Sequence, residues 1–211
     1  MAKLVVFDMD GVLVDIESSW VYVHRHFGVD NEHSLQAYLR GEIDDLEFIR
    51  RDVALWMERD PTLTMDRLKR ILSTAPLMKG ARETVEILRM KGAKTAIVSA
   101  GIDILAERVA IELEMDMFFA NGFVADCLGR LTGEGILNVR LDGKDQKVQM
   151  LANMFGFDKS GIVSVGNSRY DIPMFDASGL GIAFCPEDDD ILQRADRVVH
   201  EKDLRRILDI L

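Results

Sequence analysis

Residues 4–15 read LVVFDMDGVLVD, a short apolar run that ends at two acids, Asp8 and Asp10, followed by Gly11. A short apolar run bounded by turn residues is typical of a strand buried in a parallel sheet. We expect this first strand at residues 3–7, and similar runs predict strands at 94–98, 162–165 and 181–184. Helical periodicity separates the later runs, so the sequence predicts an α/β fold with a doubly wound parallel sheet.

Two segments depart from this alternation. Residues 16–75 carry apolar side chains at helical spacing and no convincing strand, which indicates a small α-helical cap inserted into the core. The core is then residues 1–15 and 76–211. Residues 121–139 hold four glycines between short apolar pairs, which predicts a β-hairpin excursion beside the mouth of a pocket.

Composition limits the function. The chain has 211 residues, is 48% hydrophobic and carries a formal charge of −10, which suits one compact α/β domain with an accessory. The negative charge disfavours nucleic acid and anionic membrane surfaces as partners. The first apolar run is too short for a signal peptide or a membrane span, so we expect a cytoplasmic protein.

The cysteines and histidines have no spacing that indicates chemistry. Cys127 and Cys185 are far apart and lack a CxxC partner, so we expect small buried hydrophobes rather than a disulfide or a zinc site. The histidines lack the spacing of a metal site, and solvated or capping roles are expected for them. No phosphate-loop or dinucleotide fingerprint occurs, so a nucleotide cofactor is not implied.

Asp8 and Asp10 are the first candidates for chemistry. Both fall at the carboxyl end of the first strand, the edge where open parallel sheets bind ligands. Two adjacent acids repel each other unless a divalent cation such as Mg²⁺ lies between them. One carboxylate could then attack phosphorus while the other moves the proton of the leaving group. An acid that caps a turn gives the same short pattern, and these residues alone do not separate the two interpretations.

The segment FDMDGVLVD resembles the first motif of the haloacid dehalogenase-like (HAD) phosphatases. The resemblance implies a Rossmann-like core, Mg²⁺ as cofactor, Asp8 as nucleophile and Asp10 as general acid and base. Ser99, Ala100 and Gly101 follow the second predicted strand and match the second motif of the family, a phosphate-binding turn. Ser99 taken alone is better explained as a helix cap, and its order after Asp8 favours the functional interpretation.

The remaining motifs follow in family order. The resemblance implies a catalytic lysine, for which DGKDQK offers Lys144 as first choice and Lys147 as the alternative. GNSRYD resembles the fourth motif, GDxxxD, with Asp171 retained and Asn167 in place of the first acid. The implied metal-binding residues are Asp8, Asp10, Asn167 and Asp171. Because asparagine removes one negative charge, weaker Mg²⁺ binding or a changed metal preference is expected.

Within the family, nearly the whole chain resembles the phosphoserine phosphatase branch, in its short cap and in the stretches EGILNVRLDGK and MFDASGLGIAFCP. By that resemblance, Glu17 is the cap residue that recognises the substrate ammonium. Three positions depart from the branch. Gly11-Val12 replaces a hydroxyl pair, Ala100 replaces a glycine, and Asp52 falls where a substrate-binding arginine is expected. Arg50 or Arg51 is a possible substitute for that arginine.

These observations predict a Mg²⁺-dependent phosphomonoester hydrolase, monomeric or homodimeric, that acts through an aspartyl-phosphate on a small phosphorylated metabolite. The substrate could also be a small phosphomonoester other than phosphoserine. A dehalogenase has no use for the proton carrier Asp10, and a signalling receiver lacks a cap of this kind. A binding or regulatory protein with a weakened metal site is the third alternative, suggested by Asn167.

Overall fold

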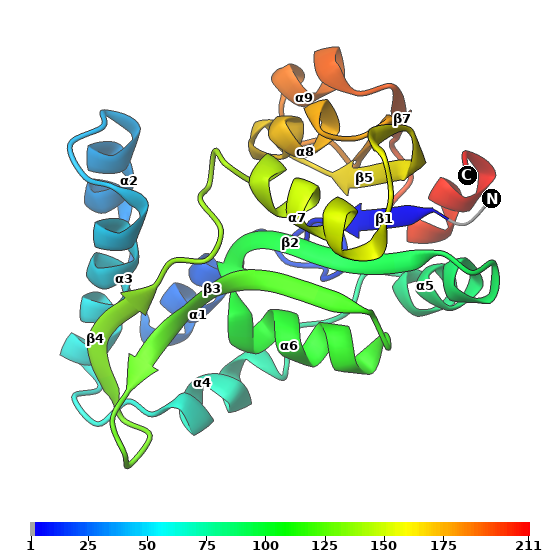
Figure 1. Cartoon of the computed structure of the whole chain (residues 1–211). Coiled ribbons are helices and arrows are strands. Elements are labelled where there is room, and N and C mark those ends of the chain that lie inside the picture. Colours follow the sequence, from blue (N-terminus) through cyan, green and yellow to red (C-terminus); the bar gives the residue numbers. More distant parts are fainter. Residues whose placement is uncertain (1–2) are drawn as a thin grey trace.

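A seven-stranded sheet forms the centre of the molecule, with strands in the order β4-β3-β2-β1-β5-β6-β7 (Figure 1). This computed structural model describes residues 3–211. The strands are β1 (Leu4–Phe7), β2 (Lys94–Ile102), β3 (Met117–Ala125), β4 (Leu131–Ile136), β5 (Ile162–Gly166), β6 (Leu180–Phe184) and β7 (Arg197–Val199). Every neighbouring pair is parallel except β3 and β4. The predicted parallel sheet is confirmed, and the four expected strands correspond to β1, β2, β5 and β6.

The side chains of β1 alternate between two buried cores, because successive residues of a strand face opposite sides of the sheet. Val5 and Phe7 belong to one core, and Leu4 and Val6 belong to the other. The first core includes α5 (Ala81–Met90) and α6 (Asp103–Glu112). The second includes α7 (Asp145–Phe155) and α8 (Ile172–Asp176). Helices therefore cover both faces of the sheet, as a doubly wound fold requires (Figure 1).

Shorter elements complete the C-terminal half. These are α9 (Asp189–Arg194) and the 3₁₀ segments η1 (Lys159–Gly161), η2 (Arg169–Asp171) and η3 (Leu204–Asp209). Strand β7 was not expected from the sequence, since only its last residue, Val199, is buried. An edge strand of three residues leaves too little apolar pattern to be recognised.

Four helices lie within the stretch 16–75: α1 (Ser19–Phe27), α2 (Glu32–Leu39), α3 (Asp45–Arg59) and α4 (Met65–Leu72). Ser18 caps α1 by accepting hydrogen bonds from two backbone N–H groups, as the sequence of a helix start favours. Trp20 of α1 and Trp56 of α3 stack with ring centroids 5.7 Å apart, and both meet Phe123 of β3 edge-on. An aromatic cluster thus fastens these helices to the sheet. We keep the word cap for residues 16–75.

Strands β3 and β4 form the antiparallel hairpin expected within residues 121–139. Strand β3 itself begins before this range, because residues from Met117 onward pair in parallel with β2, whereas its pairing with β4 begins at Gly122. Helix α3 packs closely on β4 at Gly135, where an added Cβ would lie 2.4 Å from a methyl carbon of Ile49. The hairpin therefore supports the cap from the core side (Figure 1).

Two expectations for single residues were wrong. His24 is only 2% exposed, because Trp56 Nε1 donates a hydrogen bond of 2.7 Å to its Nδ1 and fixes it inside the cap. Cys127 is exposed in the turn between β3 and β4, whereas Cys185 is partly buried, and both are free thiols. Within residues 3–211 we find no helix with the length and apolar character to cross a bilayer.

Candidate active site

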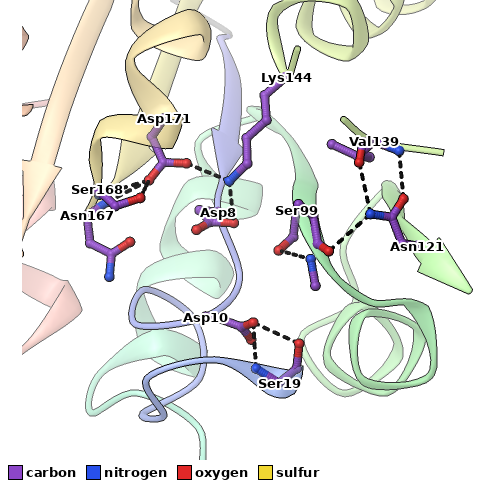
Figure 2. Close-up of polar contacts among 12 residues, drawn as sticks. Asp8, Asp10, Ser19, Ser99, Asn121, Val139, Lys144, Asn167, Ser168 and Asp171 are labelled. Carbon is purple, nitrogen blue, oxygen red and sulfur yellow. Dashed lines mark hydrogen bonds and ion pairs between the residues drawn. The ribbon is translucent and has the colours of Figure 1, made fainter. Parts of the chain in front are cut away.

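The loop after β1 places Asp8 and Asp10 at the carboxyl end of the central strand (Figure 2). Asp8 continues the sheet, since its N–H donates to the Val165 carbonyl at 2.9 Å. The chain then turns sharply, and Gly11 adopts φ +74°. The carbonyl of Met9 accepts hydrogen bonds from the next turn of the loop, including Leu13 N–H at 2.9 Å. This compact loop holds the two acids on a rigid support.

Lys144 lies between two buried carboxylates (Figure 2). It occupies the N-cap position of α7, and its Nζ is 2.9 Å from Asp8 Oδ1 and 2.6 Å from Asp171 Oδ1. Burial alone lowers the pKa of the ammonium, but the charges of Asp171 and Asp8 outweigh burial and hold that pKa above its usual value. Lys144 is therefore a permanent cation beside Asp8. Lys147, the alternative, instead lies over the Phe119 ring, 5.0 Å from its centroid.

The two acids of the loop have different neighbours. Burial and the charge of Asp171 raise the pKa of Asp8 to about 6, although Lys144 opposes the shift. Burial and the charge of Asp8 raise the pKa of Asp10 to about 7. Asp10 Oδ2 accepts hydrogen bonds from the backbone N–H and the hydroxyl of Ser19, at 2.7 and 2.8 Å, while its buried Oδ1 has no partner. Two nearby carboxylates whose neighbours give them different pKa values are suited to different roles in catalysis.

Ser99 lies near the carboxyl end of β2, next to the acids (Figure 2). Its hydroxyl oxygen accepts a hydrogen bond from Gly101 N–H at 3.1 Å. Gly101 leaves room for the first loop, because an added Cβ would lie 2.6 Å from the Ser19 hydroxyl and 2.8 Å from Asp10 Oδ2. The Ala100 carbonyl accepts hydrogen bonds from Trp20 of the cap and from Asn121 of β3, each at 3.1 Å. The predicted phosphate-binding turn is thus held from three sides.

Asp171 and Asn167 follow β5 and differ in how their polar atoms are engaged. Asp171 gives Oδ1 to Lys144, and its Oδ2 accepts from the backbone N–H groups of Asn167 and Ser168 at 2.9 and 3.1 Å. It is therefore placed to orient the loop rather than to offer a free ligand oxygen. Asn167 donates through Nδ2 to Glu187 at 3.0 Å, and its amide oxygen faces the side of Asp8 in Figure 2.

The residues at the strand ends fit a divalent cation that prefers oxygen. Asp8, Asp10 and Asn167 line one cavity, and the buried Oδ1 of Asp10 has no partner, so the site offers carboxylate and amide oxygens, a donor set typical of Mg²⁺. No cluster of three or more His, Cys, Asp or Glu ligands is present among residues 3–211. The mixed set with one asparagine is consistent with that finding. We call Asp8, Asp10, Ser99, Lys144 and Asn167 the strand-end site.

A cavity of about 540 Å³ joins the strand-end site to the cap. Its cap wall includes Glu17, Asn31 and Asp52. Glu17 is exposed and forms an ion pair with Arg25. The side chains that line the cavity from the cap are Glu17, Ser18, Trp20, Val21, Asn31, Leu35, Asp45, Phe48, Ile49 and Asp52. The structure thus brings every predicted site residue except Asp171 to one cavity, and Asp171 lies behind Lys144.

The arginines suggested as substitutes for Asp52 do not line this cavity. Arg50 pairs with Glu134 at 2.8 Å, and Arg51 pairs with Glu47 at 3.0 Å. Asp52 itself lines the cavity and is 2% exposed. An acid therefore occupies the position where the resemblance implies a cation, and neither Arg50 nor Arg51 replaces that cation.

Sequence reasoning missed three residues that hold the site: Ser19, Asn121 and Glu187. Asn121 is buried, and its amide donates to Ala100 and Val139 while its oxygen accepts from Val139 N–H at 2.8 Å. A polar residue inside the apolar run FFANGFV was a usable signal for it. Glu187 belongs to the acidic run PEDDD, which resembles a solvated surface, and no local pattern indicates that Ser19 reaches back to Asp10.

Comparison with known proteins agrees with this geometry. Residues 5–176 match the model of the haloacid dehalogenase-like hydrolase family. The chain is 31% identical over 210 residues to a phosphoserine phosphatase of Methanocaldococcus jannaschii, which covers 98% of this chain and 96% of that protein. It is 34% identical over 186 residues to the phosphoserine phosphatase of Lactococcus lactis, covering 86% of this chain and 83% of that protein.

Solved structures agree as well. The chain superimposes with a TM-score of 0.84 and 28% identity on a phospho-aspartyl intermediate analogue of a phosphoserine phosphatase, covering 100% of this chain and 99% of that chain. The protein belongs to the haloacid dehalogenase-like hydrolase family. Within that family it is a phosphatase enzyme similar to the phosphoserine phosphatases over nearly its whole length.

Proposed function

We propose that the protein is a Mg²⁺-dependent phosphomonoester hydrolase that passes the phosphoryl group of a small phosphorylated metabolite through Asp8 to water. The observation that carries the proposal is that Asp8 and Asp10, two residues apart in the sequence, have different neighbours. Asp8 Oδ1 lies 2.9 Å from the Lys144 ammonium, whereas Asp10 is held by hydrogen bonds from Ser19. The phospho-aspartyl analogue formed by a structural relative supports the same assignment.

In the first step an oxygen of Asp8 attacks phosphorus, and the ester P–O bond breaks. Asp10 donates its proton to the departing alkoxide. With a pKa raised to about 7, Asp10 is partly protonated at neutral pH and serves this purpose well. In the second step the ionised Asp10 takes a proton from water, which attacks the aspartyl-phosphate. Phosphate then leaves and Asp8 is restored.

The surrounding residues stabilise the charge on the transferring group. Lys144 is buried and permanently charged beside Asp8, so it offsets negative charge on both the nucleophile and the phosphoryl oxygens. The Ser99 hydroxyl is positioned to contact a phosphoryl oxygen. Asp8, the backbone carbonyl of Asp10 and Asn167 would hold Mg²⁺, which would supply further charge neutralisation. Asp171 orients Lys144 and the Asn167 loop.

The cap closes over the substrate in this proposal and excludes water while the aspartyl-phosphate forms. Trp20 of the cap already donates a hydrogen bond to Ala100 in the phosphate-binding turn, which couples the two parts. The resemblance assigns recognition of a substrate ammonium to Glu17, which lies on the cavity rim. A cytoplasmic location and a monomeric or homodimeric state stay predictions.

Asn167 favours a second candidate function, a binding or regulatory protein that has lost efficient catalysis. The amide in place of a carboxylate leaves one fewer negative charge for the metal. This candidate predicts binding of phosphate esters without turnover.

One assay separates the two candidates. Phosphate release is measured over small phosphomonoesters, with and without Mg²⁺, for the wild type, Asp8→Asn and Asn167→Asp. The proposal predicts Mg²⁺-dependent release by the wild type and by Asn167→Asp, and none by Asp8→Asn. If neither the wild type nor Asn167→Asp releases phosphate in a Mg²⁺-dependent way, the regulatory candidate is favoured.

A further inference from the structure

The cap side of the cavity carries only one sign of charge. Three acids, Glu17, Asp45 and Asp52, line it from the cap, and no lysine or arginine of the described cap does so. The cationic side chains that line the cavity are Lys144 and Arg169, both from the core. Lys144 is engaged with Asp8 at the phosphate end, and Arg169 is exposed and lies over the Tyr170 ring. A leaving group that enters the cap therefore meets carboxylates.

Two of the three acids already have cationic partners. Glu17 pairs with Arg25 on the exposed rim. Asp45 has Arg140 at 3.9 Å and also accepts a hydrogen bond from Leu141 N–H at 2.9 Å. These partners offset much of the charge that a ligand would meet there.

Asp52 differs, because its close partners are neutral. Asn31 Nδ2 donates to both of its carboxylate oxygens, at 3.0 and 3.2 Å. His24 Nε2 lies 3.5 Å from Asp52 Oδ2. Since His24 Nδ1 accepts a hydrogen bond from Trp56, that nitrogen carries no proton and the imidazole is neutral. Within residues 3–211, no lysine or arginine forms an ion pair with Asp52.

The charge of Asp52 is therefore both buried and uncompensated. Asp52 is 2% exposed and lines the cavity. A carboxylate that is buried without a cation has lost its solvent and gained no ion pair, so a cationic ligand group beside it is favoured. A ligand carboxylate at the same place is repelled. Trp20 and Phe48 line the same wall, and aromatic rings also attract ammonium groups.

We propose that the leaving group of this enzyme is a small amino alcohol that carries an ammonium group and no carboxylate, and that Asp52 selects it. The inference rests on the proposed function and names the substrate class of the same site. Asp8 forms its bond to phosphorus, the ester P–O bond breaks, and Asp10 gives its proton to the amino alcohol oxygen. Water then hydrolyses the aspartyl-phosphate, so one ester and one water yield one amino alcohol and one phosphate.

Three esters that differ mainly in charge test the inference. The leaving group of 2-aminoethyl phosphate has an ammonium group alone, and O-phospho-L-serine adds a carboxylate to the same framework. In 2-hydroxyethyl phosphate an uncharged hydroxyl replaces the ammonium group. Phosphate release by the full-length protein with Mg²⁺ gives kcat/KM for each ester. We expect kcat/KM for 2-aminoethyl phosphate to exceed kcat/KM for each of the other two esters by about tenfold or more, which corresponds to about 1.4 kcal/mol. An equal or higher kcat/KM for phosphoserine overturns the inference.

A matched pair of variants assigns the preference to Asp52. Asp52→Asn keeps the shape and the Asn31 contact, and it should lower the ratio of aminoethyl to hydroxyethyl ester about tenfold, mainly through KM. Asp45→Asn, whose charge Arg140 already offsets, should change that ratio less than about threefold. If Asp52→Asn slows all three esters equally, Asp52 has only a structural role and the assignment is wrong.

p-Nitrophenyl phosphate separates the failure of this inference from the failure of the proposed function. Hydrolysis of p-nitrophenyl phosphate that requires Asp8, together with a preference for phosphoserine, leaves the proposed function standing and removes the substrate class. No hydrolysis of any of the four esters removes both. The wild-type series decides the substrate class even if Asp52→Asn does not fold.

Discussion

The Lys144 ammonium lies 2.6 Å from Asp171 Oδ1, and both side chains are almost completely buried. The same nitrogen is 2.9 Å from Asp8 Oδ1. One cation thus serves two carboxylates inside the protein, where each charge depends strongly on the others. The proposed nucleophile and the loop that carries Asn167 are linked through this single side chain.

Replacing Lys144 should therefore damage both stability and turnover. Lys144→Met leaves two buried carboxylates without a cation, and we expect a loss of about 3–5 kcal/mol in the free energy of unfolding. We also expect kcat to fall by roughly 10²-fold or more. Urea unfolding and phosphate release measure the two effects.

Lys147→Met is the matched control, since the Lys147 ammonium lies over the face of Phe119 and does not line the cavity. We expect a change of about 1 kcal/mol or less in stability and a nearly normal kcat. Comparable damage from both variants would contradict the choice of Lys144.

The sequence carried enough information for the sheet and for most of the strand-end site. Short apolar runs ending in acids, Ser99 and GNSRYD predicted where β1, β2 and β5 end, and parallel strands bring those ends to one edge. Ser19 and Glu187 could not be found this way, because their contacts depend on how a loop folds back. Strand β7 was missed because an exposed edge strand lacks an apolar pattern.

The charge of Asp52 was visible in the sequence, but its meaning was not. Whether nearby Arg50 or Arg51 replaces the expected arginine depends on which face of α3 each occupies. The structure turns both toward glutamates and leaves Asp52 on the cavity wall.

Asn167→Asp should change metal binding in a specific way. Without Mg²⁺, an aspartate would face Glu187, to which Asn167 now donates a hydrogen bond of 3.0 Å, so the metal-free melting temperature should fall. With Mg²⁺, the added carboxylate should raise affinity about tenfold and enlarge the rise in melting temperature. Calorimetry and thermal unfolding check both parts. Adding Glu187→Gln should remove the metal-free loss, and unchanged Mg²⁺ affinity would count against Asn167 as a ligand.

Gly11→Ala tests the close approach of the first loop to Asn167. An added Cβ would lie 2.1 Å from Asn167 Nδ2, and Gly11 also has φ +74°. Gly41 has a similar φ of +71° with no atom within 4 Å of an added Cβ, so Gly41→Ala isolates the backbone effect. We expect about 1 kcal/mol of lost stability for Gly41→Ala and about 2–3 kcal/mol for Gly11→Ala. Equal losses in urea unfolding would show that the contact with Asn167 is unimportant.

Asp10→Asn should stabilise the metal-free protein at alkaline pH. The folded pKa of Asp10 is raised from 3.8 to about 7, so the folded state binds a proton more tightly than the unfolded chain. Stability therefore falls as pH rises from about 4 to about 7. Asn removes this loss, and we expect a gain of up to about 4 kcal/mol at pH 8 that shrinks toward pH 4. Unfolding in a chelating buffer measures it, and a gain independent of pH would argue against a raised pKa.

Covalent labelling of Asp8 tests the central claim most directly. The enzyme is mixed with Mg²⁺ and a phosphate ester that it hydrolyses. The reaction is quenched in acid during turnover, and the protein is digested for peptide mass analysis. We predict a phosphoryl group on Asp8 in the wild type, and neither label nor turnover in Asp8→Asn. Turnover by Asp8→Asn, or turnover by the wild type with the phosphoryl group on another residue, would contradict the aspartyl-phosphate mechanism.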